Sequence, residues 1–158
     1  MRVGIGYDAH RLRPGRPLII GGVRIDHPLG LDGHSDADVL THALIDALLG
    51  AAGLGDIGQH FPASDPKYQG ASSQDLLATA VRAVTKAGYR IVNVDSTVIA
   101  EEPRLQPHLG KMRTQLARSL DVDPDAVSVK PTSPEGLGAL GRMAGIAAQA
   151  VALIEATG

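Results

Sequence analysis

Residues 4–12 read GIGYDAHRL, and this short stretch decides how the rest of the chain is expected to pack. In a β-strand, successive side chains point to opposite faces of the sheet. One face of the expected strand is apolar and consists of Val3, Ile5 and Tyr7. The other face carries two glycines, which leave room for a closely packed element, and then Asp8 and His10. These two side chains start roughly 6.6 Å apart along the strand, close enough to bind one ion.

The strongest helical pattern lies at residues 36–54, which read DADVLTHALIDALLGAAGL. Apolar residues recur there with the 3.6-residue period, and Ser35 and Asp36 are candidates for the N-cap. Residues four apart lie on the same side of a helix. One such stripe, beside the apolar face, carries Asp38, His42 and Asp46.

An Asp-His-His set of metal ligands is predicted where this helix crosses the first strand, because His42 can then meet Asp8 and His10. Two imidazoles and one carboxylate suit zinc, and three protein ligands leave a fourth position open. Asp46 or Asp38 would hydrogen-bond the outer nitrogen of His42. Spacing alone favours the plainer alternative, in which Asp8 starts a turn, His10 is a surface residue and His42 is a partly buried helix histidine.

The remaining chain alternates between strand and helix patterns. Strands are expected at residues 2–10, in a hairpin-like return near 18–25, at 89–100 and at 125–133; helices are expected at 72–88 and 108–120. Residues 26–38 and 53–70 are predicted to be loops, the second long enough to serve as a lid. The alanine-rich tail at 145–156 fits a helix or a strand. This order predicts an α/β or α+β sandwich.

The composition narrows the class of protein. The 158 residues suit one domain with one core, built from Val, Ile, Leu and Ala because only 3% of residues are aromatic; we expect a single domain over 1–158. The net charge of −2 provides no basic face for nucleic acid and no polybasic run for a membrane. The absence of cysteine excludes disulfides and thiolate ligands. Without a signal peptide or a long apolar stretch, a cytoplasmic protein is expected.

Polar loops add groups suited to phosphate. His34 and Ser35 precede the expected helix, whose N-terminal N–H groups and dipole attract anions. Asp56 lies in a glycine-rich loop. The stretch KPTSPEGLGALGR (130–142) supplies Lys130, Thr132, Ser133, Glu135 and Arg142. Together such groups can hold a phosphate-bound Mg²⁺. There is no Walker pattern, which argues against a P-loop nucleotidase.

Four motifs resemble those of one family, the 2-C-methyl-D-erythritol 2,4-cyclodiphosphate synthases of the non-mevalonate isoprenoid pathway. They are GYDAH (6–10), IIGGV (19–23), GHSDADVLTHALIDALLGAAGLGDIGQHFP (33–62) and KPTSPEGLGALGR (130–142). The resemblance covers essentially the whole chain, and the 33–62 block is highly specific.

The resemblance implies a phosphorus–oxygen lyase that closes a cytidine diphosphate ester of methylerythritol 2-phosphate into a cyclic diphosphate and releases CMP. The 2-phosphate attacks the β-phosphorus, so no protein nucleophile is required. Zn²⁺, or another divalent transition metal, binds Asp8, His10 and His42, and Glu135 binds a second divalent ion, Mg²⁺ or Mn²⁺, on the diphosphate. His34 and Ser133 stabilise the transition state.

The resemblance also implies the substrate-binding residues and the assembly. The substrate contacts Ser35, Asp56, Ile57, Gly58, Phe61, Pro62, Ala63, Ser64, Asp65, Ala100, Pro103, Arg104, Leu105, Gln106, Pro131, Thr132 and Arg142. The implied fold is α+β, a mixed β-sheet with helices packed on one face (a βαβαβ-type sandwich), whose sheets face the centre of a homotrimer with interfacial active sites. The tail near 145–154 is then a strand.

Three departures from the family pattern are visible. Ser133 replaces the usual threonine and keeps the hydroxyl, whereas Ala139 and Gln149 replace residues of the trimer's central cavity and put isoprenoid diphosphate binding there in doubt. Two other functions use the same metal ligands: a zinc-dependent phosphohydrolase that activates water, and a non-catalytic trimer with a structural metal. His27, His60 and His108 are expected to be surface residues.

Overall fold

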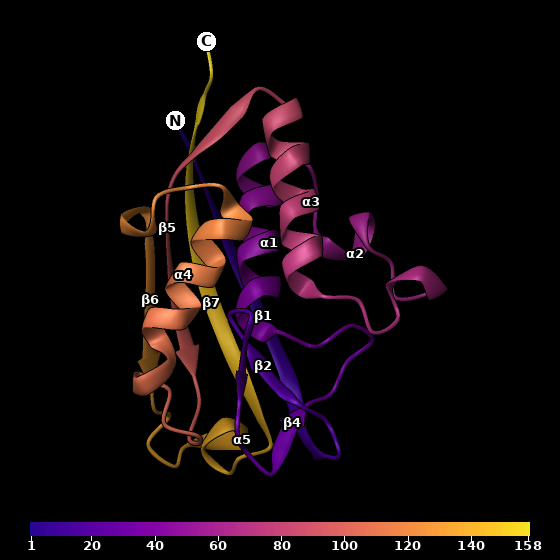
Figure 1. Cartoon of the computed structure of the whole chain (residues 1–158), viewed down its shortest axis with the longest axis vertical. Helices are drawn as coiled ribbons and strands as arrows, with labels where there is room; N and C mark the ends of the chain where they lie inside the picture. Colours follow the sequence, from indigo (N-terminus) through magenta and orange to yellow (C-terminus); the bar gives the residue numbers. More distant parts are fainter.

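The two ends of the chain pair in the middle of one sheet (Figure 1). In the computed structural model, which describes all of residues 1–158, strand β1 (Arg2–Pro14) runs antiparallel to strand β7 (Gly145–Ala156). Strand β5 (Tyr89–Ile99) continues the sheet antiparallel to β7, and β6 (Val127–Thr132) is parallel to β5. The short strand β4 (Leu29–Leu31) pairs with the end of β1, giving the order β4-β1-β7-β5-β6.

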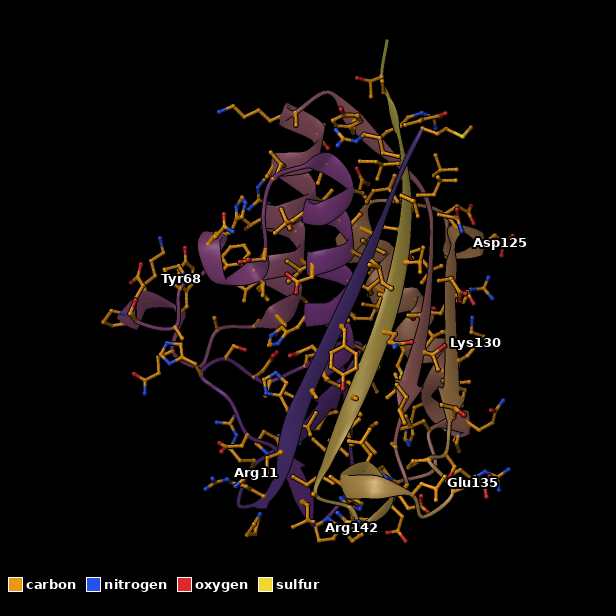
Figure 2. The ribbon with its side chains drawn as sticks, turned by 180° about the vertical axis from the view of Figure 1, so that it is seen from behind. Arg11, Tyr68, Asp125, Lys130, Glu135 and Arg142 are labelled. Carbon is orange, nitrogen blue, oxygen red and sulfur yellow. The ribbon has the colours of Figure 1, made fainter.

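Three helices cover one face of this mixed sheet: α1 (Val39–Ala52), α3 (Ser73–Lys86) and α4 (Leu109–Leu120) (Figure 1). Helix α1 packs directly on β1 and β7 and is buried along nearly its whole length. Seen from behind, the other face of the sheet has no long helix over it (Figure 2). The exposed apolar side chains on that face belong to Val3, Ile5, Tyr7 and Val151. The predicted α+β class, with a mixed sheet and helices on one face, is confirmed.

The predicted role of the glycines in β1 is also confirmed. A Cβ atom added at Gly6 would overlap the carbonyl oxygen of Ala43, and one added at Gly4 would overlap that of Ala47. Both carbonyls belong to α1, so the helix backbone rests directly on the strand backbone. The surrounding core is aliphatic, as expected, with Phe61 as its one aromatic ring.

Several predicted boundaries are wrong for identifiable reasons. The predicted loop 26–38 contains strand β4, and β1 extends to Pro14 in order to pair with it. The predicted loop 53–70 contains two helical turns, α2 (Ile57–His60) and a 3₁₀ turn at Pro66–Tyr68. The ambiguous tail is strand β7, because it has a hydrogen-bonding partner on either side, which outweighs the helix propensity of alanine.

The N-cap of α1 is Asp38, not Ser35 or Asp36. Its carboxylate is fully buried and accepts the N–H groups of Thr41, Gly21 and Gly22 at 3.1, 2.8 and 2.7 Å. The two glycines form the turn between β2 (Leu18–Ile20) and β3 (Val23–Ile25), the predicted hairpin-like return. Asp38 therefore joins this hairpin to the start of α1.

The other short elements lie in the connections. Two 3₁₀ turns flank α4, at Gln106–His108 and Pro124–Ala126, and a four-residue helix α5 (Gly138–Gly141) precedes β7. None of the helices combines the length and the hydrophobicity that a membrane crossing requires.

The contact between α1 and β1 generates a stability prediction. Gly6→Ala should lower the free energy of unfolding by about 3 kcal/mol or more, because the new methyl group must displace a helix backbone that cannot yield locally. The matched control is Gly50→Ala, an exposed position in α1 where an added Cβ meets nothing within 4 Å. That variant should be stabilised by up to about 1 kcal/mol through helix propensity. Urea denaturation measures both, and a Gly6→Ala variant as stable as the wild type would contradict the proposed close contact.

Candidate metal centre

Three ligand atoms converge where α1 crosses β1. His10 Nε2 lies 2.7 Å from Asp8 Oδ2, and His42 Nδ1 lies 3.0 Å from the same oxygen. The two histidine nitrogens are 3.2 Å apart. Asp8 and His10 come from one face of β1, and His42 reaches them because the glycines bring α1 onto the strand. The predicted proximity of these three residues is confirmed.

The tautomer of His10 follows from its outer contact. Its Nδ1 lies 2.7 Å from the carbonyl oxygen of Asp32, which can only accept a hydrogen bond. The proton of a neutral His10 ring therefore sits on Nδ1, and the lone pair of Nε2 points at Asp8 and His42. Such a convergence of acceptors is the arrangement that binds a cation.

The charges in this cluster favour an ionised Asp8. Burial alone would raise the pKa of Asp8, but the hydrogen bonds and positive charges that His10 and His42 supply when their rings are protonated outweigh it and hold the pKa well below its usual range. For His10, burial opposes the charged form, yet the hydrogen bond and charge of Asp8 raise its pKa. Asp8 thus supplies a negative charge, and protons compete with any metal for His10.

The outer nitrogen of His42 does not contact either predicted carboxylate. His42 Nε2 lies 2.8 Å from Ser73 Oγ and 3.1 Å from Ser35 Oγ. Asp38 is occupied with the N-cap, and Asp46 Oδ1 instead accepts the N–H of Ile57 at 2.8 Å. The prediction that Asp46 or Asp38 supports His42 is therefore wrong, because backbone N–H groups from other segments bind both carboxylates.

A cavity of about 620 Å³ lies beyond the carboxyl ends of the parallel strands β5 and β6. Ligands often bind at such strand ends. Its walls include eight residues that the sequence analysis selected, namely Ala100, Pro103, Arg104, Leu105, Gln106, Pro131, Thr132 and Ser133. It is also lined by Glu101 and Glu102, which lie between the selected residues Ala100 and Pro103, and by His27, which was expected to be a surface residue without a role.

The loop that follows β6 is organised by Glu101. Its carboxylate accepts the hydroxyl of Ser133 at 3.3 Å and the N–H of Gly136 at 3.1 Å, while Ser133 Oγ accepts the N–H of Glu135 at 3.0 Å. Glu135 and Arg142 are exposed at this end of the sheet (Figure 2) and do not line the cavity. Glu101 carries no motif signal that would have revealed this contact.

The loop at 61–70 folds back toward His34. His34 Nε2 lies 3.4 Å from the carbonyl oxygen of Asp65, and the His34 carbonyl accepts the N–H of Gly70 at 2.8 Å. Phe61 is buried and packs edge-on against Tyr68, which marks the projecting loop in Figure 2. Among the other selected residues, Asp56 accepts the N–H of Gln59 at 2.9 Å, and Pro62, Ala63 and Ser64 form the surface of the loop.

The expected anion site at the start of α1 is not present in the form predicted. The helix begins at Val39, four residues after Ser35, and the buried carboxylate of Asp38 already occupies its N-terminus. A helix terminus that holds one carboxylate is poorly suited to bind a phosphate as well. His34 and Ser35 instead flank His42 and the 61–70 loop.

Comparison with known proteins gives a consistent family. Residues 1–155 match the YgbB family. A protein from Syntrophomonas wolfei, named 2-C-methyl-D-erythritol 2,4-cyclodiphosphate synthase, is 59% identical over 98% of this chain and 99% of its own. A solved 2C-methyl-D-erythritol-2,4-cyclodiphosphate synthase in its CDP-bound form is 38% identical, with a TM-score of 0.90 over 98% of this chain and 100% of that chain. The bifunctional IspDF from Campylobacter jejuni is 41% identical with a TM-score of 0.95; the alignment covers 98% of this chain and 42% of that longer one.

The contacts of Asp46 generate a prediction that separates it from the metal ligands. Asp46→Ala should leave Zn²⁺ affinity within about threefold of the wild type, because Asp46 does not touch His42. Loss of a residue that hydrogen-bonds a metal ligand would instead lower the affinity about 10–100-fold. Exchange of the Ile57 amide hydrogen should accelerate on the order of tenfold or more, since a hydrogen bond to a charged group contributes about 1.5–3 kcal/mol. The amide of Thr41, held by Asp38 on the same helix, is the internal control. A large loss of Zn²⁺ affinity would contradict this assignment.

Proposed function

The chain belongs to the YgbB family of 2-C-methyl-D-erythritol 2,4-cyclodiphosphate synthases, and from this premise we propose how it catalyses that reaction. The enzyme is a cyclising lyase. It converts 4-diphosphocytidyl-2-C-methyl-D-erythritol 2-phosphate to the 2,4-cyclodiphosphate and CMP. We place the whole reaction in one domain spanning residues 1–158. The observation that carries the mechanism is the convergence of Asp8, His10 and His42 on one point.

The ligand types at this point fit zinc or a similar divalent transition metal. Two imidazole nitrogens and one ionised carboxylate are the donors that such metals prefer, and three protein ligands leave a position for substrate. When bound there, the metal supplies Lewis-acid polarisation of a phosphate oxygen. A purely structural zinc normally has four protein ligands, and the cluster contains only three residues. This count favours the catalytic role over a metal-stabilised, non-catalytic trimer.

The chemistry itself is an internal displacement at phosphorus. An oxygen of the 2-phosphate attacks the β-phosphorus, and the bond from that phosphorus to the bridging oxygen breaks, so that CMP leaves with this oxygen. No water is consumed and no protein nucleophile is needed. The protein acts by positioning the groups and stabilising charge.

Two side chains are proposed to stabilise the developing charge, His34 and Ser133. Their contacts in the structure are long, 3.4 Å from His34 Nε2 to the Asp65 carbonyl and 3.3 Å from Ser133 Oγ to Glu101. Hydrogen bonds of this length are weak, so both groups are free to turn to a phosphate. Neither acts as a base.

The cytidine end is assigned to the cavity beyond β5 and β6, whose walls consist of residues 100–106 and 131–133 with His27. Its volume of about 620 Å³ is suited to a small ligand. We assign a second ion, Mg²⁺ or Mn²⁺, to Glu135 on the diphosphate. Glu135 belongs to no cluster of ligand residues. Phosphate oxygens must therefore complete the coordination, as is common for Mg²⁺.

The erythritol end and the phosphates are assigned to the other substrate-binding residues. We place Ser35, Asp56, Ile57 and Gly58 against the erythritol portion and Phe61–Asp65 over it as a closing loop. Arg142 is exposed and available to a phosphate. The Ser35 hydroxyl lies 3.1 Å from His42 Nε2, the ring nitrogen that faces away from the metal ligands.

We further propose a homotrimer whose active sites lie between subunits. In one chain the metal ligands are on β1 and α1, whereas the cavity is at the ends of β5 and β6, which lie two and three strand spacings from β1, or about 10 and 14 Å. The uncovered face of the sheet exposes Val3, Ile5 and Tyr7, at 67%, 72% and 56%. Such a patch is typical of a subunit interface.

A product assay tests the function directly. With its substrate in H₂¹⁸O, the enzyme should release one CMP for each cyclic diphosphate formed, with no ¹⁸O in either product, because the attacking oxygen comes from the substrate. A phosphohydrolase using the same ligands would activate water and incorporate ¹⁸O. Mass spectrometry of both products decides between the two, and ¹⁸O incorporation would refute the cyclisation.

The companion variant for this assay is His42→Ala. It should lose bound Zn²⁺ and reduce turnover by more than the roughly 100-fold that loss of a supporting residue costs. His108→Ala is the matched control, because this histidine lies away from the metal cluster and makes no side-chain hydrogen bond. Retained zinc and activity in His42→Ala would disprove the metal assignment.

Shared active sites predict complementation between two inactive variants. In mixed trimers of His42→Ala and Glu135→Gln, an active site is intact when its metal ligands come from a Glu135→Gln subunit and its Glu135 comes from a His42→Ala subunit. Random mixing gives this combination in about a quarter of the sites. Activity should therefore return to about a quarter of the wild-type level after subunits are mixed by denaturation and refolding. Each variant refolded alone is the control. If mass spectrometry shows that mixed trimers have formed and activity does not return, the proposal of an interfacial site is contradicted.

A further inference from the structure

Ser73 and Asp36 form a hydrogen-bonded connection to His42 that the sequence analysis did not predict. Ser73 is the first residue of α3 and is completely buried. Its Oγ lies 2.8 Å from His42 Nε2 and also donates to the carboxylate of Asp36. The other carboxylate oxygen of Asp36 accepts the N–H of Ser73 at 2.9 Å. Asp36 therefore accepts hydrogen bonds from both the hydroxyl and the backbone N–H of Ser73.

The direction of these hydrogen bonds is determined by counting protons. A serine hydroxyl has one proton, and an ionised carboxylate has none to give. Asp36 accepts the N–H groups of Asp38 and Ser73, so it serves as an acceptor throughout. The hydroxyl proton of Ser73 must then point to Asp36. The oxygen of Ser73 can only accept from His42, which places the proton of the neutral His42 ring on Nε2.

The second hydroxyl near His42 is consistent with this direction. Ser35 Oγ is 3.1 Å from Nε2 and accepts the N–H of Ala37 at 3.2 Å. The proton on His42 Nε2 can be shared by two hydroxyl oxygens, and Ser35 Oγ is the more distant of the two. The opposite tautomer would leave the Ser73 oxygen and the Asp36 carboxylate facing each other without a proton, a repulsive arrangement in a buried site.

We propose that Ser73 is a positioning residue, which transmits the negative charge of Asp36 to His42 and holds the ring with its Nδ1 lone pair toward Asp8 and His10. A proton held on Nε2 leaves Nδ1 free to bind a metal, and a hydrogen bond from that proton to a polarised hydroxyl makes Nδ1 a better donor. His10 is oriented in the same way by the Asp32 carbonyl. The proposal rests on the metal assignment of the proposed function.

The test measures Zn²⁺ binding and the state of the His42 ring, without reference to activity. Ser73→Ala should weaken Zn²⁺ binding roughly 10–100-fold in a chelator competition. Asp36→Asn keeps the shape of Asp36 but removes its charge and should weaken binding less, about several-fold. The matched control is Ser72→Ala, because the neighbouring Ser72 is exposed and its side chain makes no capping hydrogen bond. It should bind Zn²⁺ like the wild type.

The spectroscopic readout is the ¹⁵N NMR spectrum of the histidine rings. In Zn²⁺-loaded wild-type protein, His42 should carry its proton on Nε2, with slow exchange against solvent, and bind the metal through Nδ1. Exchange of this proton should be faster in Ser73→Ala and unchanged in Ser72→Ala. The wild-type spectrum requires no variant, so the proposal remains testable even if Ser73→Ala does not fold.

The outcomes separate this inference from the function on which it rests. A His42 proton on Nδ1 in the loaded wild type would overturn the inference. So would Ser73→Ala with unchanged Zn²⁺ affinity and reduced thermal stability, which is the result expected of a purely structural hydroxyl. If the wild type and Ser72→Ala both fail to bind Zn²⁺, the metal assignment falls together with this proposal.

Discussion

The direct contact between the backbones of α1 and β1 is the constraint on which the rest of the structure depends. Gly4 and Gly6 leave no side chain between the strand and the carbonyls of Ala43 and Ala47. Any larger residue would lift the helix, and with it His42, away from Asp8 and His10. The distances of about 3 Å in the ligand cluster thus follow from two missing Cβ atoms. The same approach buries almost all of α1 and makes it the centre of the core.

One buried carboxylate, that of Asp38, and two half-buried ones, those of Asp36 and Asp46, then fix the loops around this helix. Asp38 ties the β2–β3 hairpin to the first turn of α1, Asp46 holds the start of α2, and Asp36 holds the start of α3. Each accepts backbone N–H groups from a segment distant in sequence. Because buried N–H groups left without partners are costly, these contacts specify where each loop begins and ends. The metal cluster is therefore embedded in a frame of backbone hydrogen bonds, which keeps its side chains in place.

The sequence predicts the parts of this structure that depend on local periodicity. The alternation in β1 placed Asp8 and His10 on one face, and the four-residue spacing placed His42 on the neighbouring helix. The resemblance supplied the residues of the cavity, such as Arg104 and Thr132, which share no local pattern. Strand β7 also required the resemblance, because its alanines are compatible with a helix until β1 and β5 pair with it on both sides.

The wrong predictions concern side chains whose hydrogen-bonding partners are far away in the sequence. Spacing along α1 shows that Asp38 and Asp46 lie near His42, but it does not show that the N–H groups of Gly22 and Ile57 compete for them. Ser73 is separated from His42 by 31 residues and looks like an ordinary helix start. A helix start must nevertheless bury or cap its polar groups, and here the buried hydroxyl of the first residue points at the outer nitrogen of His42. The loop at 61–70 ends three positions before this residue; the N–H of Gly70 donates to the His34 carbonyl, and the Ala71 carbonyl accepts the N–H of Asp36. The same short segment thus anchors both the proposed closing loop and the ring of His42, through contacts that no local pattern in the sequence reveals.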